Sequence, residues 1–310
     1  MKPLLLVLHG LTDGHRAQLA QSLDLIYAPT PAERAAAVAA HGARVQLVLT
    51  IGATGLTAAE MDAMPQLSLV CALGAGYENI DVAHAKQRGV VVATGAGTNE
   101  DCVADHAMGL LLAAVRGIAH LDQQTRQGVW RDVLPLPPNV SGRRLGLLGL
   151  GGIGRKIARR AEGFDIEIGY HNRSPRSDVA YRYFDQLTAL AAWADFLVVA
   201  TPGGPATRHL VNAEVLQALG PRGTLVNIAR GSVVDTAALA AALREGRLGA
   251  AGLDVYESEP RPPAELIELP NVVLTPHVAG WSPEAVQRSV DQFLANVQGH
   301  LSGQGPVAPV

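Results

Sequence analysis

Three polar side chains in the last third of the chain could together act on a small organic acid. Arg230, Glu259 and His277 each follow a short apolar run that predicts a β-strand. A guanidinium binds a carboxylate through two parallel hydrogen bonds and polarises a carbonyl beside it. A histidine donates a proton near neutral pH, and a neighbouring carboxylate favours its protonated form. The set therefore suits reduction of a 2-oxo acid, with His277 as general acid, Glu259 as its partner and Arg230 on the substrate carboxylate.

A glycine motif upstream predicts a nucleotide site. Gly149-Leu-Gly151-Gly152-Ile153-Gly154 follows the apolar run Leu145–Leu148 and opens a helical segment, which is the context that gives such a motif meaning. The first glycine permits a tight turn, the second lets a pyrophosphate approach the backbone, and the third lets helix and strand pack closely. The start of the helix then offers unpaired N–H groups to the phosphates.

The residues after the next strand bear on which dinucleotide binds. An NAD site usually ends that strand with Asp or Glu, which accepts hydrogen bonds from the ribose hydroxyls. Here Asn172 stands near that place, followed by Arg173, Ser174 and Arg176. A guanidinium can hold a 2′-phosphate, which a carboxylate would repel. We expect NADP(H) to be preferred, with Arg173 as the main clamp and Ser174 and Arg176 assisting; use of NAD(H) stays open.

Short apolar runs alternate with helical segments along the chain, which predicts an α/β fold with parallel sheets. Early strands are expected at Leu4–Leu8, Asp24–Tyr27, Val45–Leu49, Leu67–Ala72 and Val90–Ala93, with helices at Ala32–His41 and Val82–Arg88. Later strands are expected at Leu145–Leu148, Glu167–Tyr170, Phe196–Ala200, Thr224–Ile228, Ala250–Leu253 and Val272–Thr275, with a helix at Ile153–Gly163. Carboxyl ends of parallel strands share one edge, so the polar residues above should gather there.

Three further segments have distinct patterns. Asp101–Gln127 is expected to form one long helix, and the proline-rich Leu134–Asn139 to cross the surface. Pro283–Leu301 is expected to be a helix capped by Ser282, and the tail from Ser302 to fray.

The composition limits the class of protein. The chain has 310 residues, of which 48% are apolar and 17% charged, so two domains with buried cores are expected. A net charge of -3 gives no reason to expect a nucleic acid or membrane partner. Cys71 and Cys102, the only cysteines, lack metal-ligand spacing, so neither a disulfide framework nor a metal site is expected. The first apolar run is too short for a signal peptide or a membrane span, which favours the cytoplasm.

The sequence resembles the D-isomer-specific 2-hydroxyacid dehydrogenase family over nearly its whole length. The matching stretches are Gly74–Asp81, Val103–Ala107, Gly149–Gly154, Asn227–Ser232, Asp254–Pro260 and Pro276-His277. The resemblance implies catalytic roles for Arg230, Glu259 and His277, and places Asp254 near the nicotinamide carboxamide. It also implies a cofactor wall formed by Thr201, Pro202, Ile228, Ala229, His277 and Gly280.

The substrate side of the site is likewise implied by the resemblance. The loop Leu73-Gly74-Ala75-Gly76 should present N–H groups to the substrate carboxylate. Trp281 either borders the substrate pocket or packs between domains.

The resemblance further implies two Rossmann-like or flavodoxin-like domains. Residues 1–98 and 282–310 would form the substrate-binding domain, and residues 99–281 an inserted NAD(P)-binding Rossmann domain, with the active site in the cleft. A homodimer through the nucleotide domain is expected, using the helix Asp101–Gln127 and the arm around Trp130. The ending Asn172-Arg173-Ser174 resembles the NADPH-using glyoxylate/hydroxypyruvate reductase branch.

Alternatives stay open on these residues. The chain could be an NAD(H)-dependent 2-hydroxyacid dehydrogenase with another substrate range, or a catalytically weak nucleotide-sensing binding protein, because fold alone does not fix function. Formate and phosphite dehydrogenases share the scaffold, but the formate branch carries Gln where Glu259 stands. Glyoxylate, hydroxypyruvate, pyruvate, 2-ketogluconate and aryl pyruvates all remain candidate substrates.

Overall fold

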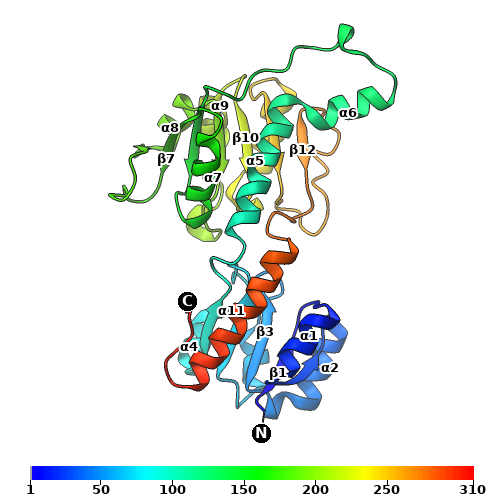
Figure 1. The fold of residues 1–310 in the computed structure, drawn as a ribbon, viewed down its shortest axis with the longest axis vertical. Coiled ribbons are helices and arrows are strands. Elements are labelled where there is room, and N and C mark those ends of the chain that lie inside the picture. The colour runs from blue at the N-terminus through cyan, green and yellow to red at the C-terminus, as the bar shows by residue number, and fades with distance from the viewer. Residues whose placement is uncertain (1) are drawn as a thin grey trace. The chain divides into compact units, whose positions relative to one another are not determined.

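The computed structural model describes residues 2–310, and the chain divides into two compact units. Unit 1 comprises Met1–Asn99 and Trp281–Val310, and unit 2 comprises Glu100–Gly280, so that unit 2 is inserted into unit 1 along the chain. Each unit has its own parallel sheet with helices on it (Figure 1). The predicted fold class, α/β with parallel sheets and an inserted domain, is confirmed.

Unit 1 is built on a five-stranded parallel sheet in the order β2-β1-β3-β4-β5, the flavodoxin-like order. Its strands are β1 (Leu4–Val7), β2 (Asp24–Tyr27), β3 (Leu47–Ile51), β4 (Leu69–Leu73) and β5 (Val91–Thr94). Its helices are α1 (Asp13–Ala20), α2 (Pro31–His41), α3 (Ala58–Asp62), α4 (Val82–Gln87) and α11 (Pro283–Leu301), with a 3₁₀ turn at Gly42–Arg44. All the predicted elements are present within two residues of their predicted ends.

Both faces of this sheet are covered, which explains why its strands are apolar throughout. Leu5 and Val7 point into the core with α11, and Leu6 points into the core on the other face. Each fully buried leucine contributes roughly 2 kcal/mol from the removal of apolar surface from water. Helix α11 begins at the predicted cap, where the Ser282 side chain accepts from the Ala285 N–H.

The C-terminal tail is ordered by backbone pairing, so the prediction that it frays was wrong. The Thr94 N–H donates to Ala308 O at 2.9 Å and the Val310 N–H donates to Val92 O at 3.0 Å. The Asn296 side chain of α11 also accepts from the Ala308 N–H at 3.1 Å. Strand β5 is the edge of the sheet, and the tail pairs with backbone groups that an edge strand leaves unbonded.

Unit 2 is built on a seven-stranded parallel sheet in the order β12-β11-β10-β9-β6-β7-β8. Its strands are β6 (Arg144–Leu148), β7 (Glu167–His171), β8 (Arg182–Tyr183), β9 (Phe196–Val199), β10 (Thr224–Asn227), β11 (Ala250–Leu253) and β12 (Val272–Leu274). The strand order reverses between β6 and β9, the position at which open α/β sheets bind ligands.

Helices cover both faces of the second sheet. Helices α5 (Glu100–Arg116) and α7 (Gly152–Glu162) pack on one core, and α8 (Leu187–Trp193), α9 (Ala213–Leu219) and α10 (Thr236–Arg244) on the other. Helix α6 (Ile118–Arg126) and 3₁₀ turns at Arg131–Val133, Pro205–Thr207 and Gly231–Val233 complete the unit.

The stretch predicted as one long helix is two helices. Gly117 has φ +62°, a left-handed conformation that glycine adopts without strain, and it separates α5 from α6. The two helices are bent by 59°. The following proline-rich segment crosses the surface as predicted, with Leu136 97% exposed.

Among the described residues, no single helix has the length and apolar composition to cross a membrane. The bent pair of α5 and α6 passes that test by length and composition only.

Candidate active site

The site residues predicted in unit 2 all follow strands of its sheet at the same edge. Gly149 comes after β6, Asn172 after β7, Thr201 after β9, Arg230 after β10, Asp254 after β11 and His277 after β12. Because every strand pair in this sheet is parallel, these residues share the carboxyl edge. The sheet therefore brings together residues that lie far apart in sequence.

The glycine motif has the geometry that its sequence predicts. Gly149 has φ +101°, and a Cβ on it would lie 2.7 Å from the O atom of Ala200, the residue directly after β9. Gly154 packs against the carbonyl of Gly149, so a side chain there would push helix and loop apart. Above Gly151 there is open space, which a side chain would fill. Helix α7 starts without a side-chain cap, so its first N–H groups can receive phosphate oxygens.

Asn172 fixes the glycine loop from the neighbouring strand. Its Oδ1 accepts a hydrogen bond from the Leu150 N–H at 2.8 Å. The next two residues, Arg173 and Ser174, are exposed on the loop after β7. The guanidinium of Arg176 is bound by Asp178, an acid that the sequence reasoning passed over although it stands two residues away.

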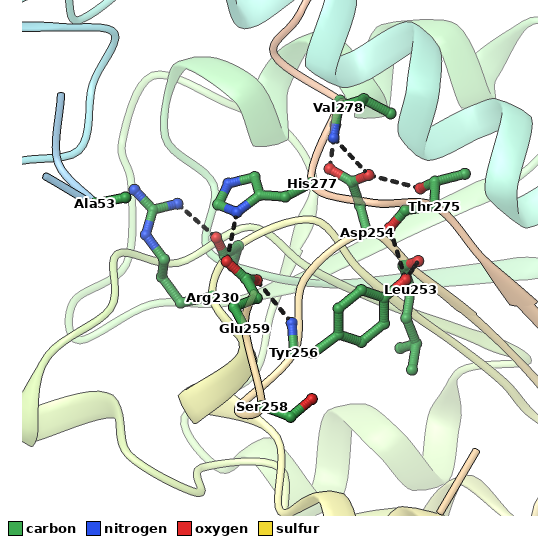
Figure 2. Close-up of polar contacts among 12 residues, drawn as sticks. Ala53, Arg230, Leu253, Asp254, Tyr256, Ser258, Glu259, Thr275, His277 and Val278 are labelled. Carbon is green, nitrogen blue, oxygen red and sulfur yellow. Dashed lines mark hydrogen bonds and ion pairs between the residues drawn. The ribbon is translucent and has the colours of Figure 1, made fainter. Parts of the chain in front are cut away.

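His277 and Glu259 form a hydrogen-bonded pair (Figure 2). His277 Nδ1 lies 2.8 Å from Glu259 Oε2, and Glu259 Oε1 accepts from the Tyr256 N–H at 2.9 Å. The bond to the Glu259 carboxylate raises the pKa of His277, and the charges of Glu259 and Asp254 add to that effect against burial and Arg230. The pair is accessible, with 43% and 34% of the two side chains exposed.

The pKa of Glu259 is shifted in the direction that favours its charged form, as is that of His277. Burial alone would raise the pKa of Glu259, but hydrogen bonds from His277 and the Tyr256 N–H hold it below its usual range. The positive charges of His277 and Arg230 act in the same direction. Near neutral pH the pair therefore favours an imidazolium beside a carboxylate.

The loop that carries His277 is fixed by Asp254, whose side chain is 1% exposed. Its Oδ1 accepts from the Thr275 hydroxyl at 2.6 Å and the Val278 N–H at 2.9 Å, and its Oδ2 accepts from the Ala279 N–H at 2.8 Å. These bonds hold His277 at φ +55°, a left-handed conformation that is uncommon for a residue with a side chain. The family resemblance implied a place for Asp254 near the nicotinamide carboxamide, and its hydrogen bonds to this loop were not predicted.

Two further residues support the same loop and were missed. His106 Nε2 lies 2.9 Å from Thr275 Oγ1 and 3.5 Å from Asp254 Oδ1. The Tyr256 hydroxyl donates to Thr275 O at 2.6 Å, and burial raises the pKa of Tyr256 to about 12. His106 belongs to the Val103–Ala107 motif, and its place in that motif was the only sequence signal for it.

Arg230 is positioned by residues at the end of β10 and in the loop after β9. The buried Asn227 donates from Nδ2 to Arg230 O at 3.0 Å and accepts from the Ala229 N–H at 3.0 Å. A Cβ on Gly203 would lie 2.6 Å from Arg230 Cγ, so that glycine leaves room for the arginine side chain. Arg230 lies beside the His277–Glu259 pair (Figure 2), and its charge lowers the pKa of both members.

The comparison with protein families decides the identity of this unit. Residues 108–279 match the family described as D-isomer specific 2-hydroxyacid dehydrogenase, NAD binding domain. The match covers more than half of the chain. The chain belongs to this family. It is an oxidoreductase that uses a nicotinamide cofactor.

Known members of the family resemble the whole of this dehydrogenase. Hydroxyphenylpyruvate reductase of Plectranthus scutellarioides is 42% identical over 257 residues, which are 83% of this chain and 82% of the relative. Glyoxylate/hydroxypyruvate reductase A of Arabidopsis thaliana is 38% identical over 294 residues, 94% of each chain. The NADPH-dependent glyoxylate/hydroxypyruvate reductase of Sinorhizobium meliloti, solved with NADP and malonate, has a TM-score of 0.92 and 38% identity over 100% of this chain and 97% of its own.

The residues present in this dehydrogenase fit a dinucleotide. The open space above Gly151 and the uncapped start of α7 lie at the strand switch point beside β9. The other predicted wall residues, Pro202, Ile228, Ala229 and Gly280, lie in loops at the carboxyl edge of the same sheet.

The predicted substrate loop of the dehydrogenase lies in unit 1. Residues 73–76 run from the last residue of β4 into the following loop, and Gly74 has φ +83°. The Gly74 carbonyl accepts from the Gly95 N–H at 2.7 Å, which ties this loop to the end of β5. Trp281 is 71% exposed. The substrate roles of these residues stay predictions.

Proposed function

We propose that this dehydrogenase reduces a small 2-oxo acid to the D-2-hydroxy acid with NADPH, and that His277 is the general acid. The proposal rests on the 2.8 Å contact between His277 and Glu259. This pair lies beside Arg230, on the sheet edge that also holds the glycine motif. In this proposal unit 2 binds the cofactor and unit 1 contributes to substrate recognition.

The proton would come from His277 Nε2. Nδ1 is engaged by Glu259, so the ring keeps a fixed orientation and Nε2 is the atom left to face a reacting oxygen. A nicotinamide held at the glycine motif would supply the hydride that the carbonyl carbon accepts. As the carbonyl oxygen gains negative charge, the Nε2–H bond breaks and the proton forms the hydroxyl group, leaving a neutral imidazole beside Glu259.

Arg230 would bind the substrate carboxylate. Its guanidinium can form two parallel hydrogen bonds with a carboxylate and so fix the adjacent carbonyl relative to His277. Asn227 fixes the backbone of this arginine, and Gly203 leaves room for its side chain.

A matched pair of measurements tests this function. The protein should oxidise NADPH in the presence of glyoxylate or hydroxypyruvate, the substrates that the names of its relatives indicate. His277→Asn should lower kcat by about 10²- to 10⁴-fold while the protein still binds NADPH. A parent protein that oxidises no NADPH with any 2-oxo acid would favour a nucleotide sensor instead.

The proposed preference for NADP(H) rests on Arg173. Arg173 and Ser174 are exposed on the loop after β7, where a 2′-phosphate would approach, and no acid ends the strand. The relative from Sinorhizobium meliloti is NADPH-dependent. Arg173→Ala should raise the Kd for NADPH far more than the Kd for NADH, and equal effects on the two would refute the assignment.

We also propose a homodimer through unit 2. The arm that follows α6 exposes large apolar side chains, with Trp130 68%, Val133 79% and Leu136 97% exposed. A groove of about 450 Å³ is lined by α5 and α6, by residues 135–139 of this arm and by loops at the amino edge of the sheet. A second copy of this arm suits that groove because both surfaces are apolar.

Light scattering on the purified protein tests the dimer. The parent should have twice the mass of the chain, and Leu136→Asp should give the monomer, because it places a charge on the arm without touching the core. Ile267→Asp, at another half-exposed apolar position of unit 2, should leave the mass unchanged. A monomeric parent, or a Leu136→Asp variant that stays dimeric, would contradict the proposal.

A further inference from the structure

The loop after β7 carries an acid that the proposed chemistry does not use. Asp178 Oδ1 accepts from Arg176 Nε at 2.8 Å, and Oδ2 accepts from Arg176 Nη2 at 2.9 Å. The same Oδ2 lies 2.9 Å from Arg155 Nη1. One carboxylate therefore engages two guanidinium groups, one of them through a two-pronged fork.

This cluster joins the two segments that border the adenosine ribose in a fold of this type. Arg155 lies in the first turn of α7, directly after Gly154. Arg176 lies in the loop that Asn172 ties to the glycine motif, and its N–H donates to the Tyr170 hydroxyl at 2.8 Å. A 2′-phosphate bound beside Arg173 would therefore approach the same cluster.

The charges of the cluster are unequal. Two arginines face one carboxylate, so the cluster keeps a net positive charge, and Arg173 on the same loop adds to it. The hydrogen bond from Arg176, helped by the charges of Arg155 and Arg176, lowers the pKa of Asp178 to about 2. Asp178 therefore stays ionised at any pH at which the enzyme would work.

A carboxylate in a guanidinium fork takes the place that a phosphate would use, since both bind through two parallel hydrogen bonds. We propose that Asp178 sets the cofactor selectivity by competing with the 2′-phosphate of NADP(H) for Arg176 and Arg155. This inference rests on the proposed binding of that phosphate at this loop. The 2′-phosphate of NADP(H) must displace Asp178 from the arginines and is repelled by its charge. NAD(H) has no 2′-phosphate, so Asp178 does not weaken its binding.

Asp178→Asn tests the inference, because it keeps the size of the side chain and removes its charge. Calorimetric titration should show the Kd values for NADP⁺ and 2′,5′-ADP falling by a few-fold, because the variant removes a unit negative charge within a few ångströms of the phosphate. The Kd for NAD⁺ should not change. Added salt should reduce the gain, because exposed charges are screened.

A matched control removes a similar pair elsewhere in unit 2. Glu245 Oε2 accepts from Arg247 Nε at 2.6 Å, with the same two-residue spacing, between α10 and the amino end of β11. Glu245→Gln should leave all three Kd values unchanged. In an Arg176→Ala background the gain from Asp178→Asn should shrink, since one of the released partners is gone.

The outcomes separate this inference from the proposed function. A Kd for NADP⁺ that is unchanged or higher in Asp178→Asn would overturn the inference. A higher Kd would show that Asp178 orients the arginines to bind the phosphate. If Arg173→Ala weakens NADP⁺ binding far more than NAD⁺ binding while Asp178→Asn has no effect, the phosphate clamp stands and the inference alone fails. If Arg173→Ala leaves the ratio of the two Kd values at its parental value, the clamp itself is lost and the inference with it.

Discussion

Replacing Glu259 by glutamine isolates the electrostatic role of the pair. The amide has the size of the carboxylate and can still accept from His277 Nδ1, so the ring keeps its orientation while the negative charge disappears. The carboxylate holds the pKa of His277 above its ordinary value of 6.5. Its loss should lower that pKa, and the acid form needed for reduction should disappear at a lower pH.

The size of the effect follows from the contact. A hydrogen bond to a charged group contributes about 1.5 to 3 kcal/mol. Because 43% of the His277 side chain and 34% of the Glu259 side chain are exposed, solvent screening reduces this to about 1 kcal/mol. That energy corresponds to a roughly 5-fold smaller fraction of imidazolium at pH values above the pKa of the parent histidine.

The raised pKa of His277 means that its acid form is complete below the ordinary value of 6.5 and is lost as pH rises through the raised value. The rate of reduction should therefore be similar in parent and variant at low pH. It should be roughly 5-fold lower in Glu259→Gln at high pH.

The assay is kcat for NADPH oxidation measured across pH with saturating 2-oxo acid. Glu257→Gln is the control, because Glu257 lies in the same loop but binds His209 and Thr236. It should keep the parental pH profile. A Glu259→Gln profile with the parental midpoint, or one moved to higher pH, would refute the electrostatic role of Glu259.

Two other changes test the elements that position the site. Arg230→Lys keeps the charge but loses the fork, so KM for the 2-oxo acid should rise by about 10-fold or more with the Kd for NADPH unchanged; an unaltered KM would remove Arg230 from substrate binding. Asp254→Asn leaves an amide facing backbone N–H donors, so the free energy of unfolding in urea should fall by about 1 to 3 kcal/mol. Unchanged stability would show that the loop does not depend on Asp254.

The positions of strands and of the glycine motif could be predicted because they follow local rules. Apolar runs such as Leu145–Leu148 are buried strands, and a glycine directly after such a run indicates a tight turn. The approximate meeting of Arg230, Glu259 and His277 also followed from the sequence, since carboxyl ends of parallel strands share an edge.

The features that were missed depend on contacts between distant segments. The tail pairs with β5 only because that strand is the edge of its sheet, and His106 reaches Thr275 across 169 residues. Asp178 was not considered, because one of its two partners, Arg155, comes from helix α7 and lies 23 residues earlier in the chain. Gly117, which separates α5 from α6, is itself a residue that can end a helix. One continuous helix was predicted because the apolar residues keep a helical spacing around it.

Transfer of deuterium from labelled NADPH to product tests the central chemistry most directly. With a 2-oxo acid and NADPH deuterated at the transferring carbon of the nicotinamide, NMR of the product should show the label on the former carbonyl carbon of the D-2-hydroxy acid. An unlabelled product, or no reaction with any 2-oxo acid, would contradict hydride transfer at this site, and an L-2-hydroxy acid would contradict the proposed stereochemistry.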